Sequence, residues 1–200
     1  KFPYTTHPYH IKDNITYIET PYGDFPIHFF GKHNLTNMNA ARLACNAVGV
    51  KDIDFYKAIS SFKGASKRLE LVAQNNDCAV YKDFAHAPSK LKATINAVRE
   101  MFPTRTLIAC IELHTFSSLN QKFLSHYKHA MKEADIAIVY YNPAAVEHKK
   151  LPPISDTMIA NAFDQDNLNI FHDSTELHQY LQTLNNQNST FLLMSSGNFG

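Results

Sequence analysis

Cysteine is scarce in this 200-residue sequence, and its spacing argues against cysteine-based sites. Cys45, Cys78 and Cys110 are odd in number, far apart and never arranged as CxxC. Neither a disulfide framework nor a zinc knuckle is therefore expected, and we predict no metal site. The same pattern favours a reducing compartment, the cytosol.

The chain also has no excess of charge of one sign and no long hydrophobic run. Its 19 Lys and Arg residues against 18 Asp and Glu residues give a formal net charge of +1. No basic field therefore points to nucleic acid or to an anionic membrane. The longest apolar runs, such as residues 107–111 and 136–141, are strand-sized, whereas a membrane helix needs roughly 20 residues. We expect neither a nucleic-acid nor a membrane partner.

Several enzyme signatures are absent as well. The patterns HExxH, GxSxG, GxGxxG and GxxxxGK[ST] do not occur, so a complete phosphoryl-transfer site is missing. The first ten residues contain aromatics and prolines where a signal peptide needs a continuous apolar stretch, and the chain does not begin with Met. We therefore expect a piece of a longer protein.

Hydrophobic residues occupy 44% of positions, which is enough for one sizeable core. From residue 78 onward, short apolar runs alternate with segments of helical period, a pattern that predicts βα units. The expected fold class is α/β, with a Rossmann-like, mostly parallel sheet and helices on both faces. The predicted strands are residues 78–83, 106–112, 135–141, 168–171 and 190–194, and the predicted helices are residues 89–101, 119–134, 156–163 and 174–184.

Residues 1–61 follow a different pattern. A hairpin and two helices are too little for a domain, so we interpret this segment as the end of a neighbouring domain. We expect it to pack loosely or to pair with another copy, because one face of the hairpin would be bare. Residues 62–200 would form the self-contained domain. The hairpin is predicted over residues 15–19 and 25–30, and the helices over residues 36–48 and 53–61.

Two early clusters have side chains suited to a nucleotide. Asn34 and Asn37 follow a predicted strand, where their amides suit a purine ring or a phosphate; the alternative is that one of them only caps a helix. Arg68 lies in a short basic segment, residues 62–70, and suits a bidentate phosphate contact. Its alternative is an ordinary solvated surface.

Further candidates follow the predicted strands, at the edge where parallel sheets bind ligands. Asp83 suits ribose hydroxyls and His86 suits substrate orientation or proton exchange, unless Asp83 only forms a local turn. His114 shares this rim, and the small residues around Ser196 and Asn198 permit close approach of a ligand or form a plain turn. Two other readings remain open. One is a nicotinamide-binding Rossmann module, which would lack its glycine fingerprint; the other is a metallohydrolase using Asp83, His86 and His114.

Taken in order, these clusters resemble the carboxyl-terminal half of the Mur ligases, ATP-dependent enzymes that add amino acids or peptides to UDP-N-acetylmuramate. Residues 31–41 resemble the family's GxHNxxN-x-x-A element, at the end of its central ATPase domain. Residues 62–70 match its FxGxxxRxE linker and residues 83–88 its D[YF][AG]HxP loop. Residues 194–200 resemble its closing G[AS]GNxG-like loop.

The resemblance implies roles for the nucleotide group. Asn34 and Asn37 would lie against adenine, Arg68 would reach the phosphates as a catalytic residue, and Asp83 would hold the ribose. Because Arg68 and Asp83 are expected on loops, we predict that replacing either one lowers ligation but leaves folding intact.

The resemblance also implies a site for the amine substrate, formed by His86, His114, Ser196 and Asn198. The closest branch is the one that attaches a recycled murein tripeptide, with the L-alanine-adding branch next. Thr115 and Ser118 stand where the alanine-adding branch has arginines, and His114 stands where other tripeptide-adding enzymes have arginine. These differences leave the amine open.

The implied reaction forms an amide through an acyl phosphate, with ATP and magnesium as cofactors, in cytoplasmic peptidoglycan synthesis or recycling. The partners would be UDP-N-acetylmuramate and an amino acid or the murein tripeptide. The phosphate loop, the magnesium ligands and the UDP-binding domain would precede Lys1. The chain alone is therefore expected to be inactive.

Overall fold

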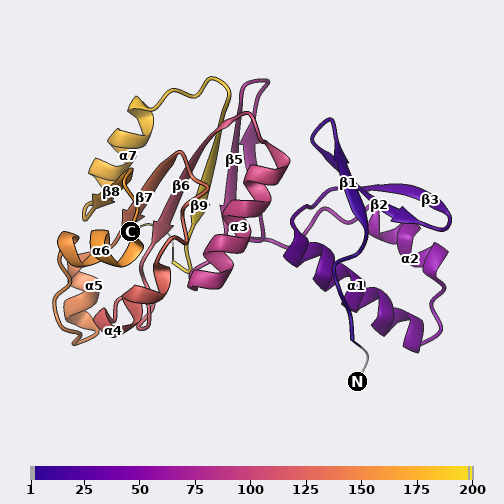
Figure 1. Ribbon diagram of the computed structural model, residues 1–200, viewed down its shortest axis with the longest axis horizontal. Helices are drawn as coiled ribbons and strands as arrows, with labels where there is room; N and C mark the ends of the chain where they lie inside the picture. Colours follow the sequence, from indigo (N-terminus) through magenta and orange to yellow (C-terminus); the bar gives the residue numbers. More distant parts are fainter. Residues whose placement is uncertain (1–2, 198, 200) are drawn as a thin grey trace.

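The structure is a computed structural model that describes residues 3–197 and residue 199, and its strands form two separate sheets. The smaller sheet has the strand order β1-β2-β3, and the larger has the order β4-β5-β9-β6-β7-β8. Figure 1 shows the two sheets side by side, with helix α3 between the large sheet and helix α1 of the amino-terminal unit. No helix in the described part of the chain is long and apolar enough to cross a bilayer.

Five strands of the large sheet are parallel, and all five were predicted from the sequence. They are β5 (Cys78–Asp83), β6 (Thr106–Glu112), β7 (Ile136–Tyr140), β8 (Leu168–Phe171) and β9 (Ser189–Met194). Their order differs from the 3-2-1-4-5-6 order of dinucleotide-binding folds, which argues against the nicotinamide-binding reading.

A sixth strand, β4 (Glu70–Gln74), pairs antiparallel with β5 at one edge of the sheet. The sequence did not predict it, because every residue of β4 is exposed. Neither the buried run nor the alternating burial that identifies the other strands is present there.

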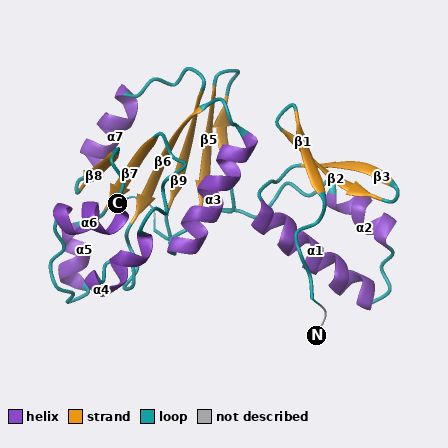
Figure 2. Ribbon diagram, viewed as in Figure 1, coloured by secondary structure: helices purple, strands orange, loops and turns teal. Residues whose placement is uncertain are grey.

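Helices cover both faces of the large sheet, as the α/β prediction requires (Figure 2). One face packs against α3 (Pro88–Met101), α4 (Gln121–Leu124), the 3₁₀ turn η1 (Ser125–Tyr127), α5 (Pro143–His148) and α6 (Asp156–Phe163). The other face packs against α7 (Ser174–Thr183). Helix α5 was not predicted; Asn142 caps it by accepting from the backbone N–H of Ala144, and Pro143 occupies its first turn.

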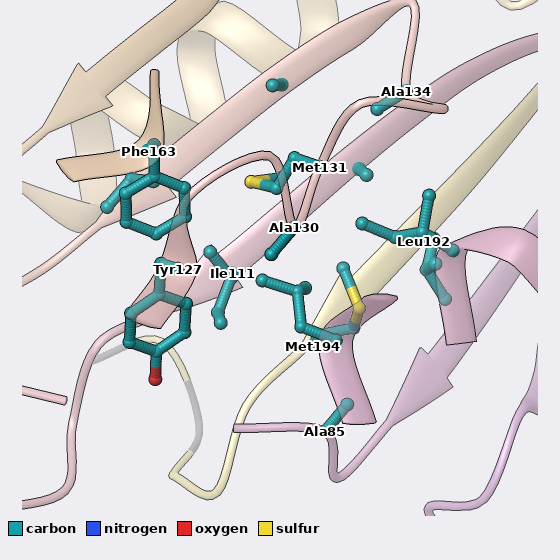
Figure 3. Packing of buried hydrophobic residues seen from close by; sticks show 14 of the residues in the cluster. Ala85, Ile111, Tyr127, Ala130, Met131, Ala134, Phe163, Leu192 and Met194 are labelled. Carbon is teal, nitrogen blue, oxygen red and sulfur yellow. The ribbon is translucent and has the colours of Figure 1, made fainter. Parts of the chain in front are cut away.

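The single helix predicted over residues 119–134 is wrong. The segment forms only α4, η1 and turns, because His129 adopts a left-handed backbone (φ 56°) and its N–H donates to the carbonyl of Phe163 at 2.9 Å. Tyr127 stacks on the Phe163 ring at 5.0 Å between centroids (Figure 3). The apolar residues of this segment are therefore buried through tertiary contacts with α6 rather than along one helical face.

The amino-terminal unit is more complete than a hairpin with two helices. It contains the antiparallel strands β1 (Tyr9–Lys12), β2 (Ile15–Thr20) and β3 (Gly23–Ile27), with helices α1 (Lys32–Ala47) and α2 (Asp52–Ile59). The helices cover one face of this sheet, so that face is not bare. Together they enclose a small core of Ile18, Ile27, Leu35, Met38, Phe55 and Tyr56.

The expectation that residues 1–61 pack loosely is also wrong. Phe30 is only 6% exposed and joins the core of the large sheet, with edge-to-face contacts to Tyr81 at 5.4 Å and Phe102 at 6.3 Å. Next to it, Gly31 has a φ of 92°, and a Cβ there would lie 2.6 Å from the Cβ of Ala97 in α3. The two units therefore share a close interface, and the domain boundary between residues 61 and 62 stays a prediction.

We predict that Phe30→Ala destabilises the chain by about 3–5 kcal/mol, because it leaves a cavity where the two units meet. Phe116→Ala is the matched control: Phe116 is 64% exposed, and its loss should cost less than about 1 kcal/mol. Urea unfolding of both variants measures the difference. Equal losses in the free energy of unfolding for the two variants would contradict the prediction that Phe30 holds the two units together.

Candidate functional site

A cavity of about 840 Å³ lies between the two units, within the size range of small-molecule sites. Four of the predicted site residues line it, although they come from distant parts of the sequence. The amino-terminal unit contributes Phe29, His33, Asn34, Asn37, Met38, Ala41 and Ile59, and Phe62 follows at the predicted boundary. Beyond residue 62, the lining residues are Gly64, Ala65, Arg68, Asp83, Ser89, Lys90, Ala93 and Thr94.

Asn34 and Asn37 lie on the first turns of α1, which begins four residues earlier than predicted. Gly31 is the N-cap and no side chain caps the helix, so the alternative that an asparagine caps it is wrong. The Nδ2 of Asn34 donates to the carbonyl of Phe30 at 2.9 Å. Asn37 follows Asn34 by one turn, which places both amides on the helix face toward the cavity.

Asp83 ends β5 and is 4% exposed, so it is a buried residue rather than a loop residue. One carboxylate oxygen accepts from the backbone N–H of Leu69 at 2.7 Å. The other accepts from the N–H of Ala85 at 2.7 Å and from the hydroxyl of Thr94 at 3.4 Å. The bond to Ala85 is the predicted Asx turn, but Asp83 does more than form this turn, because it also binds Leu69 and Thr94 and lines the cavity. The carboxylate also fixes the linker to the sheet.

Arg68 directly precedes Leu69 in the linker, and its side chain is exposed on the cavity wall. Its guanidinium carbon lies 5.7 Å from the centroid of the Phe84 ring. The backbone bond from Leu69 to Asp83 therefore fixes the chain next to Arg68, while the side chain can extend toward a ligand.

His33 also lines this cavity, although the sequence did not single it out. Burial holds its pKa below the ordinary value; the nearby Asp83 carboxylate opposes this shift and the Arg68 guanidinium adds to it. His33 therefore supplies a neutral imidazole to the cavity at neutral pH. Its place in the GxHNxxN element, directly before Asn34, could have marked it as a site residue.

Of the remaining predicted residues, His86, His114 and Ser196 lie on loops that follow strands and do not line the cavity. The Nδ1 of His86 is 2.9 Å from the carbonyl oxygen of Phe84. His114 is half-exposed, and its Nδ1 lies 3.5 Å from a carboxylate oxygen of Glu112, a buried residue that the sequence analysis did not select. The Ser196 hydroxyl is buried without a partner among the described residues. Asn198 lies outside the described residues.

The residues predicted for a single crevice at the strand ends therefore fall into different places. Asp83 lines the cavity, whereas His114 and Ser196 lie on the loops after β6 and β9, which we call the rim. Within residues 3–197 and 199, no three His, Cys, Asp or Glu side chains are placed to hold a metal ion. Asp83 lines the cavity with both oxygens engaged. This arrangement contradicts the metallohydrolase reading with Asp83, His86 and His114.

The fold is an α/β unit with a six-stranded, mostly parallel sheet, packed closely against a smaller amino-terminal unit, and the cavity lies between them. The family model described as "Mur ligase, glutamate ligase domain" matches residues 67–197. The chain belongs to the Mur ligase family.

Individual relatives agree with this assignment. The UDP-N-acetylmuramate–L-alanine ligase of Desulfitobacterium hafniense is 31% identical over 82% of this chain and 37% of its own length. A solved UDP-N-acetylmuramate–alanine ligase from Thermotoga maritima superimposes with a TM-score of 0.71 at 17% identity, covering 93% of this chain and 40% of that one. A MurF ligase from the same organism, in complex with ADP, gives 0.64 at 15% identity over 94% and 42%. The chain thus spans less than half the length of these proteins.

Because Asp83 is buried, we expect Asp83→Ala to destabilise the fold, contrary to the prediction made from the sequence. It leaves the buried N–H groups of Leu69 and Ala85 without an acceptor, at a cost of about 2–5 kcal/mol. Asp83→Asn keeps one acceptor oxygen and should lose less, and Arg68→Ala should lose about 1 kcal/mol or less. Urea unfolding compares the three; an unchanged midpoint for Asp83→Ala would refute the anchoring role.

The lowered pKa of His33 predicts a stability loss in acid. The unfolded chain takes up a proton near the ordinary pKa of 6.5, whereas the folded chain resists it. Stability should therefore fall as pH drops below 6.5 toward the lower folded pKa. Melting temperatures at about pH 7.5 and about pH 5.5 should differ less in His33→Gln than in the parent. His28→Gln, an exposed control on the same unit, should behave like the parent; an unchanged difference in His33→Gln would contradict the prediction.

Proposed function

We propose that this chain is the carboxyl-terminal part of an ATP-dependent ligase that joins an amine to UDP-N-acetylmuramate. One observation carries the proposal: the segments that contain Asn34, Asn37, Arg68 and Asp83 come from both units, yet they line one cavity. Family membership supports a ligase, and a structural neighbour of the same fold is described as a complex with ADP.

The side chains around the cavity suit ATP. Asn34 and Asn37 offer amide donors and acceptors for the adenine edge. Arg68 is exposed and offers a fork of N–H donors for phosphate oxygens, while its guanidinium carbon lies 5.7 Å from the centroid of the Phe84 ring. Asp83 has three donors already, so of roughly four lone-pair positions on its carboxylate about one is left for a ribose hydroxyl. We therefore assign Asp83 mainly to shaping the nucleotide site.

Magnesium does not fit the residues that line this cavity. The ion prefers several hard oxygen ligands in octahedral geometry, and Asp83 is the only carboxylate among the described lining residues, with both oxygens engaged. We propose that the magnesium ligands belong to another part of the longer protein, and the roles assigned to this chain do not depend on them.

In the proposed reaction, the muramate carboxylate is activated as an acyl phosphate and an amine attacks it, releasing phosphate and forming the amide. This chain would position ATP through the cavity and the amine through His86, His114, Ser196 and Asn198. The three free cysteines are consistent with the proposed cytoplasmic location.

Two amines are candidates for the substrate that attacks the acyl phosphate. The name of the Desulfitobacterium relative favours L-alanine. The loop after β6 favours a murein tripeptide. The alanine-adding branch has arginines at the positions of Thr115 and Ser118. In this chain Ser118 is fully buried, and its hydroxyl oxygen accepts a hydrogen bond from the backbone N–H of Thr115 at 2.9 Å. These two side chains shape the loop and put no cation at the two arginine positions for the carboxylate of L-alanine; the nearby Lys149 ammonium lies 5.4 Å from the centroid of the Phe116 ring. We propose the tripeptide as the amine, with L-alanine as the alternative.

The test is a ligation assay of the full-length protein with ATP, UDP-N-acetylmuramate and either amine. We expect ADP release that depends on the tripeptide. Arg68→Ala should lower kcat/KM for ATP by about 10- to 150-fold, because it removes a charge-assisted phosphate contact of roughly 1.5–3 kcal/mol. Lys63→Ala is the matched control, an exposed cation of the same linker that does not line the cavity.

The possible outcomes separate the readings. ADP release with L-alanine alone would assign the alternative amine. ATP binding without ADP release for any amine would indicate a nucleotide-binding module without ligase activity. Equal kinetics for the Arg68→Ala and Lys63→Ala proteins would refute the phosphate role of Arg68.

A further inference from the structure

A buried acid outside the cavity joins two loops of the rim. Glu112 ends β6 and is 5% exposed. Its Oε2 accepts hydrogen bonds from the Ser195 hydroxyl and from the backbone N–H of Phe199, the latter at 3.0 Å. Its Oε1 lies 3.5 Å from the Nδ1 of His114. A buried carboxylate is stable only when it is paired and hydrogen-bonded in this way.

The surroundings fix the orientation of this carboxylate. A Cβ on Gly197 would lie 2.9 Å from the Oε2 of Glu112, so a side chain at this position would require the carboxylate to shift. The backbone N–H of Gly197 donates to the Ser195 oxygen at 2.6 Å, and the Ser195 hydroxyl is therefore oriented to donate its own proton to Glu112. Oε2 is committed to the loop after β9, and Oε1 is left to face His114.

The donor and acceptor rules, applied to the 3.5 Å approach of Nδ1 to the carboxylate, favour one of the two tautomers of His114. A carboxylate oxygen only accepts hydrogen bonds, so the nitrogen that faces it is favoured as the N–H in the neutral imidazole. That nitrogen is Nδ1. The Nε2 on the other edge of this half-exposed ring is consequently an acceptor.

We propose that Glu112 is a positioning residue that sets the tautomer of His114, so that Nε2 presents a lone pair to the amino or ammonium group of the incoming substrate. The assignment of that group as the ligand rests on the proposed function. The tautomer rests only on the contacts of Glu112.

Glu112→Gln tests the tautomer with almost no change of shape. The Phe199 N–H and the Ser195 hydroxyl both donate, so the amide oxygen of the glutamine must occupy the Oε2 position. Its NH₂ group then faces Nδ1, which has to become an acceptor, and the ring proton moves to Nε2. We expect the nitrogen chemical shifts of the His114 ring, measured by NMR on the 200-residue chain at about pH 8, to exchange their protonated and unprotonated character.

Two variants control this measurement. His114→Gln assigns the ring signals. Ser195→Ala removes one bond to Oε2 but keeps the negative charge beside Nδ1, so the parent tautomer should persist. If Glu112→Gln leaves the tautomer unchanged while its melting temperature matches that of the parent, the proposal is overturned. A parent protein with the proton on Nε2 would overturn it as well.

The kinetic part uses the full-length ligase. Glu112→Gln should lower kcat/KM for the amine by about 10-fold or more, because the acceptor for its charged N–H group is lost, while KM for ATP stays at the parent value. A loss shared equally by ATP and the amine would indicate a general structural effect and would refute the positioning role. If the parent is inactive with every amine, the proposed function fails, whereas the tautomer measurement still decides the role of Glu112.

Discussion

The arrangement of the cavity depends on the carboxylate of Asp83. Through Leu69 it fixes the linker that enters the large sheet, through Ala85 it shapes the loop that leaves β5, and through Thr94 it contacts α3. These segments carry Arg68, Lys90 and the other cavity residues that follow position 62. A buried charge with three donors is costly to disturb, and this explains how an exposed linker can hold an arginine at a defined position. The aspartate is therefore as much a structural residue as a candidate ligand-binding one.

Much of the fold followed from hydrophobic pattern, and the failures have physical causes. The parallel strands were predictable because their buried runs contrast with the amphipathic segments between them, as in Ile136–Tyr140 and Asp156–Phe163. Strand β4 was not predictable, since its pairing with β5 buries none of its side chains. The helix predicted over residues 119–134 failed because stacking of Tyr127 on Phe163 gives the same apolar residues a different way to be buried. In the first case the strand has no hydrophobic pattern to read, and in the second a tertiary contact outweighed local periodicity.

For the candidate site, the sequence indicated residue types and their order but not their surroundings. The motifs identified Asn34, Asn37, Arg68 and Asp83, and all four line one cavity. They did not reveal that Asp83 is buried, because the donors that surround it include backbone N–H groups, which every residue but proline carries. Glu112 was missed for a related reason: it looks like the polar end of a strand until the fold brings Ser195 and Phe199 to it from the far end of the chain.

Strand β9 connects the two acidic anchors. It lies between β5 and β6, so its end stands between Asp83 and Glu112. The backbone N–H of Ser195 donates to the carbonyl of Asp83 at 3.0 Å, while its hydroxyl donates to the carboxylate of Glu112. Ser195 is thus bonded both to the end of β5, which carries Asp83, and to Glu112, which joins the loops after β6 and β9. Because side-chain packing and hydrogen bonds leave little slack in a buried sheet, a displacement of one group is expected to move the other. The order of the strands, rather than any single motif, therefore fixes the spacing between the two groups.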